Sequence, residues 1–306
     1  MSQLLPYEVE GNQNSSNMVI FIHGWPDNIC IWDETVKNLD LKNSYILKLS
    51  YPNYHKQQES KFGLNFKQVV EKMRNTIEKV DDGKNYKKVL VGHDWGAYVS
   101  YLYDATYPKT IDQLICLDIS PYIQKSFLAV AFTIFYQWWN IWAFVIGLIY
   151  KPFGNILTKL LILTLFAKYP YDKERINCTM GYFYLYLWID LFKNIFLRQK
   201  RALAGYKPSV PFTYIFAKDK PFQFHNDRWL QFVQKNSNNE LHMVKGKTKD
   251  TIDNSSISNI TDVTYDSYQD IADLYMTKDS ELSSNHDNSY SQLFSQNSFD
   301  FSQQYS

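Results

Sequence analysis

The chain has 306 residues, 45% of them hydrophobic and 17% aromatic, which is enough for one α/β domain with an inserted subdomain. Its three cysteines lack the spacing of a disulfide framework or a metal site, which excludes a disulfide-stapled secreted module and fits a cytoplasmic location. The net charge of +1 combines a basic body of about +10 with an acidic segment from Asp250 onward. We interpret the body's charge as scattered solvated lysines, with association with an anionic membrane surface as the alternative and with no nucleic-acid partner expected.

The first half of the chain alternates strand and helix patterns. Residues 1–8 show no basic region followed by an apolar core, so no secretory signal is expected. Buried-type strands are predicted at 18–22, 44–49 and 113–119. Residues 66–80 have the apolar spacing of a helix. This alternation predicts an α/β fold with a mostly parallel sheet and helices on both faces.

The stretch with the strongest chemical signal is Gly92-His93-Asp94-Trp95-Gly96. It follows the apolar run 89–91 and precedes apolar residues at helical spacing, so a strand, a sharp turn and a helix are predicted, with Asp94 at the apex. Glycines on both sides are expected where the turn is strained and the packing leaves no room for a Cβ. A carboxylate at such an apex can displace a leaving group from a saturated carbon, giving an ester of Asp94. The alternative is an ordinary turn.

A long uncharged stretch follows. Residues 126–150 contain no Asp, Glu, Lys or Arg, and a second apolar run covers 160–167. The first run is long enough to span a bilayer. Three tryptophans, Trp138, Trp139 and Trp142, lie in its middle and not at the ends, where membrane interfaces concentrate such rings. We therefore predict a buried helical cap, with a transmembrane hairpin as the alternative.

The α/β pattern then resumes. Strands are predicted at 211–217 and 240–244, with a helix at 226–234 between them. After these the composition shifts to Ser, Asn, Asp and Gln, which predicts a disordered acidic tail. The predicted organisation is core, first part, 1–120; helical cap, 121–205; core, second part, 206–246; tail, 247–306.

Two motifs together resemble the epoxide hydrolase and haloalkane dehalogenase branch of the α/β-hydrolases. They are His23-Gly24-Trp25-Pro26 and the Asp94 turn, and the resemblance covers roughly residues 15–246. It implies the α/β-hydrolase fold with an inserted cap and Asp94 as nucleophile. It also implies that the backbone N–H groups of Trp25 and Trp95 form an oxyanion hole for the ester carbonyl. Dehalogenases of this branch commonly carry a polar residue where this chain has Trp25, so the resemblance favours epoxides.

The same resemblance suggests a proton donor. The segment Phe135-Tyr136-Gln137 is similar to the part of the cap in which epoxide hydrolases place one of two tyrosines that bind the epoxide oxygen. Tyr184 is the candidate for the second tyrosine. Such a phenol can donate a proton as the ring opens. With 24 tyrosines in the chain, each candidate has a purely structural alternative as a core residue.

The resemblance also places an acid and a base after the cap. Asp219 fits the acid that follows the strand, with Asp118 as an alternative. The histidine is expected at 247–249, where the sequence has no histidine. His242 is the nearest substitute, although alternation places it inside a strand. The remaining candidates are less favoured: His55, His225 and His286.

The predicted function is a hydrolase of epoxide hydrolase type, acting on small apolar epoxides without a cofactor or metal. Hydrolysis of the Asp94 ester requires a base to activate water, so without one the reaction would stop after a single turnover. The alternatives are a haloalkane dehalogenase, a catalytically inactive relative that binds a ligand or a membrane, and a gene product altered near its C-terminal end.

Overall fold

The computed structural model describes residues 3–38, 41, 44–55, 59–122, 127–164, 175–217 and 223–244. All of these belong to one structural unit, Met1–Thr261. Several predictions fall outside the described residues and stay predictions: the acid Asp219, the loop at 247–249 and the disordered tail.

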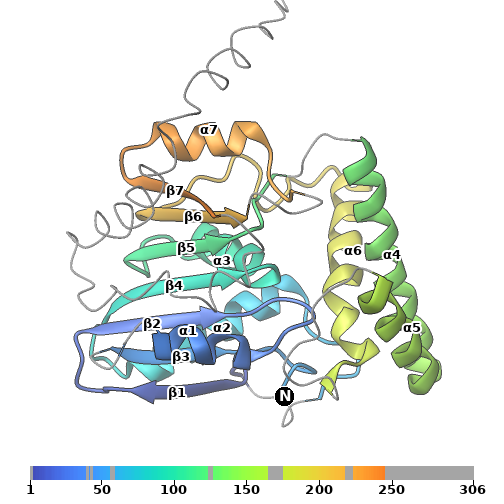
Figure 1. The fold of residues 1–306 in the computed structure, drawn as a ribbon, viewed down its shortest axis with the longest axis horizontal. Coiled ribbons are helices and arrows are strands. Elements are labelled where there is room, and N and C mark those ends of the chain that lie inside the picture. Colours follow the sequence, from blue (N-terminus) through green and yellow to red (C-terminus); the bar gives the residue numbers. More distant parts are fainter. Residues whose placement is uncertain are drawn as a thin grey trace, which may run out of the picture. The chain divides into compact units, whose positions relative to one another are not determined.

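A seven-stranded sheet organises the described residues, with strand order β1-β3-β2-β4-β5-β6-β7 (Figure 1). The strands are β1 (Tyr7–Gly11), β2 (Asn17–Ile22), β3 (Tyr45–Leu49), β4 (Lys87–His93), β5 (Gln113–Leu117), β6 (Phe212–Ala217) and β7 (Asn239–Val244). Every neighbouring pair is parallel except β1 and β3. The predicted mostly parallel sheet is thus confirmed. The carboxyl ends of the parallel strands β2 to β7 lie along one edge, where the chemical motifs lie.

Helix α2 (Phe66–Asp81) shows how the sequence sets a helix and its buried face. Asn65 caps its first turn in a reciprocal pair with Gln68, so two backbone N–H groups that lack helical partners are satisfied. Val69, Met73 and Ile77 recur at helical spacing and are buried, as predicted. The helix therefore lies against the sheet along its apolar stripe.

The remaining core helices cover the two faces of the sheet. They are η1 (Ile29–Trp32), α1 (Asp33–Asn38), α3 (Trp95–Thr106) and α7 (Asp227–Lys235). On one face Phe21 of β2 packs on Trp32 of η1 with ring centroids 4.9 Å apart. On the other, Tyr214 of β6 contacts Trp229 of α7, which in turn contacts Tyr101 of α3. The sheet is buried on both sides, which explains why its central strands are apolar runs.

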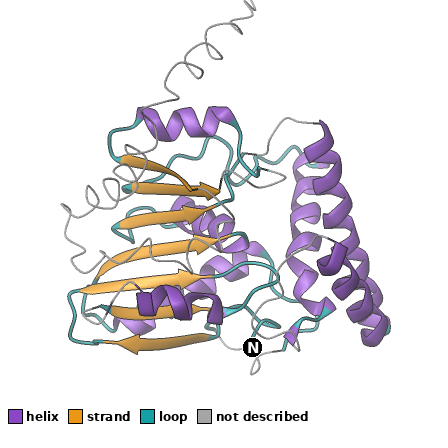
Figure 2. Cartoon of the chain, viewed as in Figure 1, coloured by secondary structure: helices purple, strands orange, loops and turns teal. Residues whose placement is uncertain are grey.

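Helices inserted between β5 and β6 stand beside the carboxyl ends of the strands (Figure 2). They are α4 (Phe127–Ile149), α5 (Lys151–Thr164), η4 (Cys178–Gly181) and α6 (Tyr182–Phe196). Helices α4 and α5 approach closely at two glycines. A Cβ on Gly154 would lie 2.6 Å from the Cα of Gly147, so a side chain there would separate the helices.

Helix α4 is the one helix among the described residues that is long and apolar enough to cross a membrane by length and composition. It nevertheless has a buried face, which includes Asn140, Ala143 and Phe144. The Asn140 side chain donates to the Tyr136 carbonyl (3.1 Å), and the backbone of Asn140 lies against Gly181 of η4. This contact with neighbouring helices supports the interpretation of α4 as a packed insertion over that of a transmembrane hairpin.

Candidate active site

Strand β4 runs directly into α3 through Asp94. Asp94 has φ 53° and ψ −120°, a left-handed conformation that is strained for a residue with a side chain. The turn is tight on both sides. A Cβ on Gly92 would lie 2.7 Å from the Gly96 carbonyl oxygen, and one on Gly96 would lie 2.2 Å from the Ile22 carbonyl oxygen. Only glycine fits at these positions, so the apex residue is held in a fixed direction.

The Asp94 carboxylate lies against the loop that follows β2. The backbone N–H of Trp25 donates to Asp94 Oδ2 at 2.8 Å. The backbone of Trp95 is a second hydrogen-bond partner of this carboxylate. The approach requires Gly24, because a Cβ there would lie 2.4 Å from Asp94 Oδ2. The structure therefore brings Asp94 to the two N–H groups expected to form an oxyanion hole.

His23 holds the same loop in place. Its ring is fully buried, with Nδ1 3.0 Å from the Gly24 carbonyl oxygen and Nε2 3.0 Å from Ser50 Oγ. Burial lowers the pKa of His23 to about 4, so the ring is neutral at physiological pH. Both ring nitrogens are engaged, and His23 therefore orients the loop and does not serve as a base.

The electrostatic environment of Asp94 balances burial against nearby donors. Burial raises the pKa of Asp94, while His93 and the backbone hydrogen bonds from Trp95 and Trp25 lower it. The net result is a pKa above the ordinary value for aspartate. A raised pKa goes with a more basic carboxylate, which is the stronger nucleophile once it is ionised.

Two tyrosines of the helical insertion belong to the aromatic group around the nucleophile turn. Tyr136 from α4 and Tyr184 from α6 meet edge to face, with ring centroids 5.9 Å apart. Tyr184 also contacts the rings of Trp25 (5.8 Å) and Trp95 (5.1 Å). Burial raises the pKa of both phenols, and the charge of Asp94 raises each further. Both hydroxyls thus stay protonated at neutral pH and are able to donate.

A third tyrosine was not predicted from the sequence. Tyr51, just after β3, is fully buried against the rings of His23 (5.0 Å) and Phe183 (4.8 Å). Its hydroxyl has no hydrogen-bond partner among the described residues. Burial raises its pKa, and Asp94 contributes in the same direction. A buried hydroxyl without a partner is unfavourable unless something else binds it, which makes Tyr51 a candidate contact for substrate or water.

The alternative acid Asp118 lies near the turn. It follows β5 with φ 68° and is almost fully buried. Its Oδ1 accepts from the Ala217 backbone N–H at 3.3 Å, and its Oδ2 lies 3.6 Å from His93 Nε2. The favoured acid Asp219 and the histidine His286 lie outside the described residues.

The structure does not bring His242 to Asp94, contrary to the sequence-based candidate assignment. His242 pairs with Ile215, Ile215 with Leu117, and Leu117 with His93, the residue before the nucleophile. Three strand spacings of about 4.8 Å place His242 roughly 14 Å from that position. Its Nε2 lies 3.3 Å from Glu240 Oε2 on the same strand face. His242 lies within strand β7 and its side chain faces Glu240 of the same strand, which is why it does not reach Asp94.

Two further histidines are also engaged elsewhere. His225 is buried, with Nδ1 3.4 Å from the Tyr214 hydroxyl and its ring 4.4 Å from that of Phe216. His55 lies 3.9 Å from the carboxylate of Glu8. Neither contact is with the residues grouped around Asp94.

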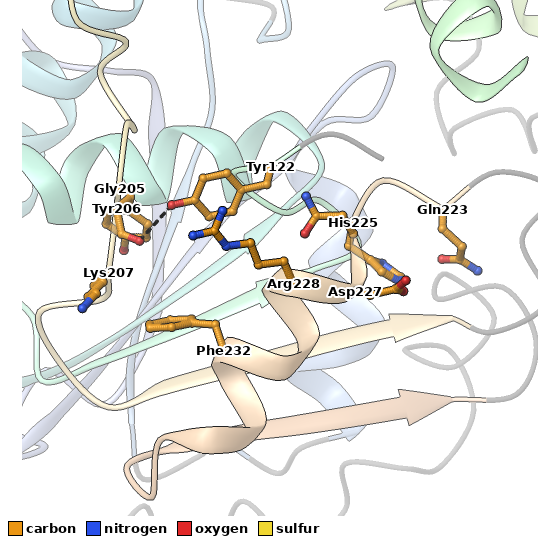
Figure 3. Close-up of a pocket in the computed structure, with 10 residues that line it drawn as sticks. Tyr122, Gly205, Tyr206, Lys207, Gln223, His225, Asp227, Arg228 and Phe232 are labelled. Carbon is orange, nitrogen blue, oxygen red and sulfur yellow. Dashed lines mark hydrogen bonds between the residues drawn. The ribbon is translucent and has the colours of Figure 1, made fainter. Parts of the chain in front are cut away.

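A pocket of about 740 Å³ lies between helix α7, with the residues just before it, and the segment 205–207 that leads into β6 (Figure 3). Its lining includes Tyr122, Lys207, His225 and Arg228, and the Tyr122 hydroxyl donates to the Tyr206 carbonyl at 3.4 Å. None of the residues around the nucleophile turn lines it. The described residues also contain no group of three His, Cys, Asp or Glu placed to hold a metal ion.

Comparisons with known proteins identify the family to which the fold belongs. Residues 17–248 match a family profile described as alpha/beta hydrolase fold. The chain is 27% identical over 112 residues to Epoxide hydrolase 1 of Caenorhabditis elegans, covering 36% of this chain and 27% of that protein. It is 28% identical over 101 residues to the Abhydrolase domain-containing protein abhd-5.2 of the same organism, covering 33% and 22%. The chain therefore spans less than a third of the length of these two relatives.

Solved structures share the fold. An epoxide hydrolase of Bacillus megaterium, in complex with an inhibitor, superposes with a TM-score of 0.56 at 19% identity, covering 78% of this chain and 88% of that one. A structure from work on carboxylesterases of Nitrososphaera gargenis gives 0.55 at 16% identity, covering 90% and 94%. At these identities the likeness concerns the fold alone.

Proposed function

We propose that this chain, which belongs to the α/β-hydrolase fold family and is a hydrolase of that fold, is of the epoxide hydrolase type and acts through an ester of Asp94. The observation that carries the proposal is the grouping at the elbow. An aspartate, and not a serine, occupies the apex, and two protonated tyrosines from the insertion are grouped with the ring of Trp95, within range of the Asp94 charge. The partial similarity to Epoxide hydrolase 1 of Caenorhabditis elegans supports the same reaction class.

In the first half of the reaction Asp94 attacks a ring carbon of the epoxide. With Oδ2 held by the Trp25 N–H, Oδ1 forms the new carbon–oxygen bond while the ring carbon–oxygen bond breaks. The released oxygen takes a proton from Tyr136 or Tyr184, so no free alkoxide is expelled. The walls at this point are aromatic, which suits small apolar epoxides.

In the second half water attacks the ester carbonyl and yields a diol and free Asp94, and the proton that water gives up returns to the tyrosinate left by the first half. The N–H groups of Trp25 and Trp95 stabilise the oxyanion of that step. Water must lose a proton to a base, and residues 246–249 offer only Gly, Lys, Thr and Lys. A lysine is protonated at neutral pH and cannot accept that proton. Unless another residue supplies the base, the ester is therefore expected to accumulate.

One described histidine is a candidate base if product does form. His93 precedes the nucleophile, and its Nε2 lies 3.6 Å from Asp118 Oδ2. Its Nδ1 is buried and has no hydrogen-bond partner among the described residues. A carboxylate at one ring nitrogen and an unoccupied second nitrogen is the arrangement that a general base requires.

A haloalkane dehalogenase is the second candidate, favoured by one observation. The indole Nε1 of Trp25 is buried at the site and has no hydrogen-bond partner among the described residues. An N–H donor of this kind could hold a departing halide, as the phenols of Tyr136 and Tyr184 could hold an epoxide oxygen. Both candidates form an ester of Asp94 and differ in the leaving group.

The test uses intact-mass measurement of the purified full chain after mixing with a small aryl epoxide or a matched chloroalkane. The proposal expects an adduct with the epoxide, located on the peptide that contains Asp94. Asp94→Asn should remove it, whereas Asp190→Asn, which alters a half-exposed carboxylate of α6, should not. Halide release without reaction of the epoxide would favour the dehalogenase. No adduct and no product with either substrate would refute both.

If diol forms over many turnovers, the position of the base becomes measurable. His93→Gln and His242→Ala should then be compared in the rate of ester hydrolysis. Loss in the His93 variant alone would assign the base to His93. Loss in the His242 variant alone would require that strand β7 move relative to this structure.

A further inference from the structure

The helical insertion exposes an apolar surface that the reaction does not use. Besides Phe127 at the first position of α4, ten large apolar side chains of α4, α5 and the residue between them are each at least 42% exposed. They are Leu128, Ile134, Phe135, Trp142, Ile149, Tyr150, Phe153, Ile156, Leu160 and Leu163. We call this set the outer insertion surface. At about 150–250 Å² for a large ring, it amounts to an area on the order of 1,000 Å², against about 300–600 Å² for the largest patch of a typical monomer.

The surface follows from the sequence period of the two helices. In α4 the residues Leu128, Phe135, Trp142 and Ile149 recur every seven positions and lie on one side of the helix. The opposite side carries the buried residues, among them Asn140. Helix α4 therefore has an apolar stripe opposite its buried face. Within the described residues, only the buried face packs against other elements.

Helix α5 repeats the arrangement. Phe153, Ile156, Leu160 and Leu163 are exposed at intervals of three and four, while its other side is buried. The side chain of Trp139 donates to the Leu157 carbonyl at 2.9 Å and so fixes α5 to α4. The outward stripes of the two helices therefore belong to one rigid pair. Figure 2 shows this pair on the side of α6 that faces away from the sheet.

The charges carried by α4 and α5 have one sign. Residues 127–164 contain no Asp or Glu, and their two cations, Lys151 and Lys159, are exposed. At the end of α6 the apolar character continues with exposed Phe192 and Phe196. These are linked to Trp138 of α4 through Trp188, with ring centroids 5.1–6.2 Å apart.

More cations follow that end of α6. Arg198, Lys200 and Arg201 come directly after it and are exposed. The acid of α6, Asp190, lies 3.7 Å from Lys193. The rim of the surface is thus basic.

We propose that the outer insertion surface docks in the interface of a bilayer that contains anionic lipid. Exposed Trp, Tyr, Phe and Leu with a basic rim is the composition of helices that lie in the headgroup region. The buried face of α4 stays on η4 and α5, so the helices lie on the bilayer and do not cross it. A second copy of the chain fits less well, because pairing this face with itself would bring two basic rims together.

The proposal is independent of the reaction. If the proposed function also holds, docking would set the Tyr136 and Tyr184 end of the insertion near the phase in which apolar epoxides concentrate. Its test, however, needs no substrate, so failure of one proposal leaves the other standing.

The test is vesicle flotation of the full chain with phosphatidylcholine vesicles, alone or containing phosphatidylserine. We expect binding to the anionic vesicles, weaker binding to the neutral ones, and a decrease at high salt. Trp142→Glu combined with Ile156→Glu should lower binding at least tenfold. Met243→Glu is the matched control, since Met243 is 56% exposed and Trp142 57% exposed, and Met243 lies on β7 of the sheet. The control should bind like wild type.

A gentler change gives a second readout. Lipids brominated in the acyl chains should quench tryptophan fluorescence of the wild type, and Trp142→Phe should lose part of that quenching while binding persists. The proposal is overturned if wild type does not float, or if the double variant floats like the control. It is also overturned if light scattering finds a lipid-free dimer that the double variant dissolves, or if carbonate extraction leaves the chain in the membrane pellet.

Discussion

Replacing Gly24 by alanine tests whether the loop after β2 sets the position of the nucleophile. The added Cβ would lie 2.4 Å from both Cβ and Oδ2 of Asp94, well inside van der Waals contact. The carboxylate must then move away from the Trp25 N–H, with which it now shares a 2.8 Å hydrogen bond. This hydrogen bond aligns the carboxylate, so its loss acts on ester formation by misplacing the attacking oxygen. A displacement of about 1 Å costs about 100-fold by itself. We therefore expect ester formation to slow by about 100-fold.

The assay is the single-turnover rate of ester formation with a small aryl epoxide, followed by quenched-flow mass measurement. Gly83→Ala is the matched control, because Gly83 also has positive φ (74°) but nothing lies within 4 Å of the added Cβ. That variant should lose some stability from backbone strain and keep its rate. The reasoning is refuted if Gly24→Ala reacts within threefold of wild type, or if both variants lose the same amount.

Three more predictions concern the nucleophile, the two tyrosines and the buried face of α2. Asp94→Asn should abolish ester formation. In wild type the rate of ester formation should fall as the pH drops through the pKa of Asp94, and this fall should occur at a higher pH than for an exposed aspartate, because burial raises that pKa. A pH–rate profile that stays flat on the acid side would contradict this. Tyr136→Phe and Tyr184→Phe should each slow ring opening while the other phenol remains, and the double variant should slow it by about 10²–10⁴-fold; an unchanged double variant would remove both from the mechanism. Ile77→Ala, at a buried position of α2, should cost about 2–5 kcal/mol in urea unfolding, whereas Lys79→Ala on the same helix should stay within about 0.5 kcal/mol; equal losses would show that burial is not the cause.

The sheet was predictable from the sequence because its central strands are buried on both faces. The apolar runs of β2 and β3 are specified by burial alone, and the helix of residues 66–80 by its apolar period. The first strand, β1, was missed for the opposite reason. It pairs antiparallel with β3 at the sheet edge, and four of its five residues are exposed, so no apolar pattern marks it. Edge strands are held by backbone hydrogen bonds, which leave little trace in side-chain choice.

The sequence pattern predicts too late an end for strand β5. The expected strand 113–119 stops at Leu117, because Asp118 adopts positive φ. Its carboxylate then turns back to the Ala217 N–H and to His93. A pattern of apolar residues does not report where a polar side chain will replace the ladder's hydrogen bonds. That local change is what brings a carboxylate to the elbow.

The candidate site, too, is only partly predictable from the sequence. The elbow could be read from its glycines, because the close contacts at Gly92 and Gly96 are a steric requirement that sequence records. Tyr51 could not, because nothing in its immediate sequence separates it from the other 23 tyrosines of the chain. Its place beside His23 and Phe183 depends on the packing of the segment after β3 against α6, which is a tertiary property.

The geometry of the Asp94 carboxylate also bears on whether the chain completes turnover. A hydrogen bond from the Trp25 N–H stabilises the ionised carboxylate more than the neutral ester, so by itself it opposes the attack on the epoxide. The same N–H stabilises the oxyanion that forms when water attacks the ester, and there it lowers the barrier. The Trp25 hydrogen bond thus favours hydrolysis of the ester and not its formation. A protein that only bound a ligand, or that was alkylated once, would gain nothing from two donors at this carboxylate. We therefore favour a complete hydrolase over an inert relative. The candidates for the general base are therefore His93, whose buried Nδ1 has no hydrogen-bond partner among the described residues, and the residues after Val244.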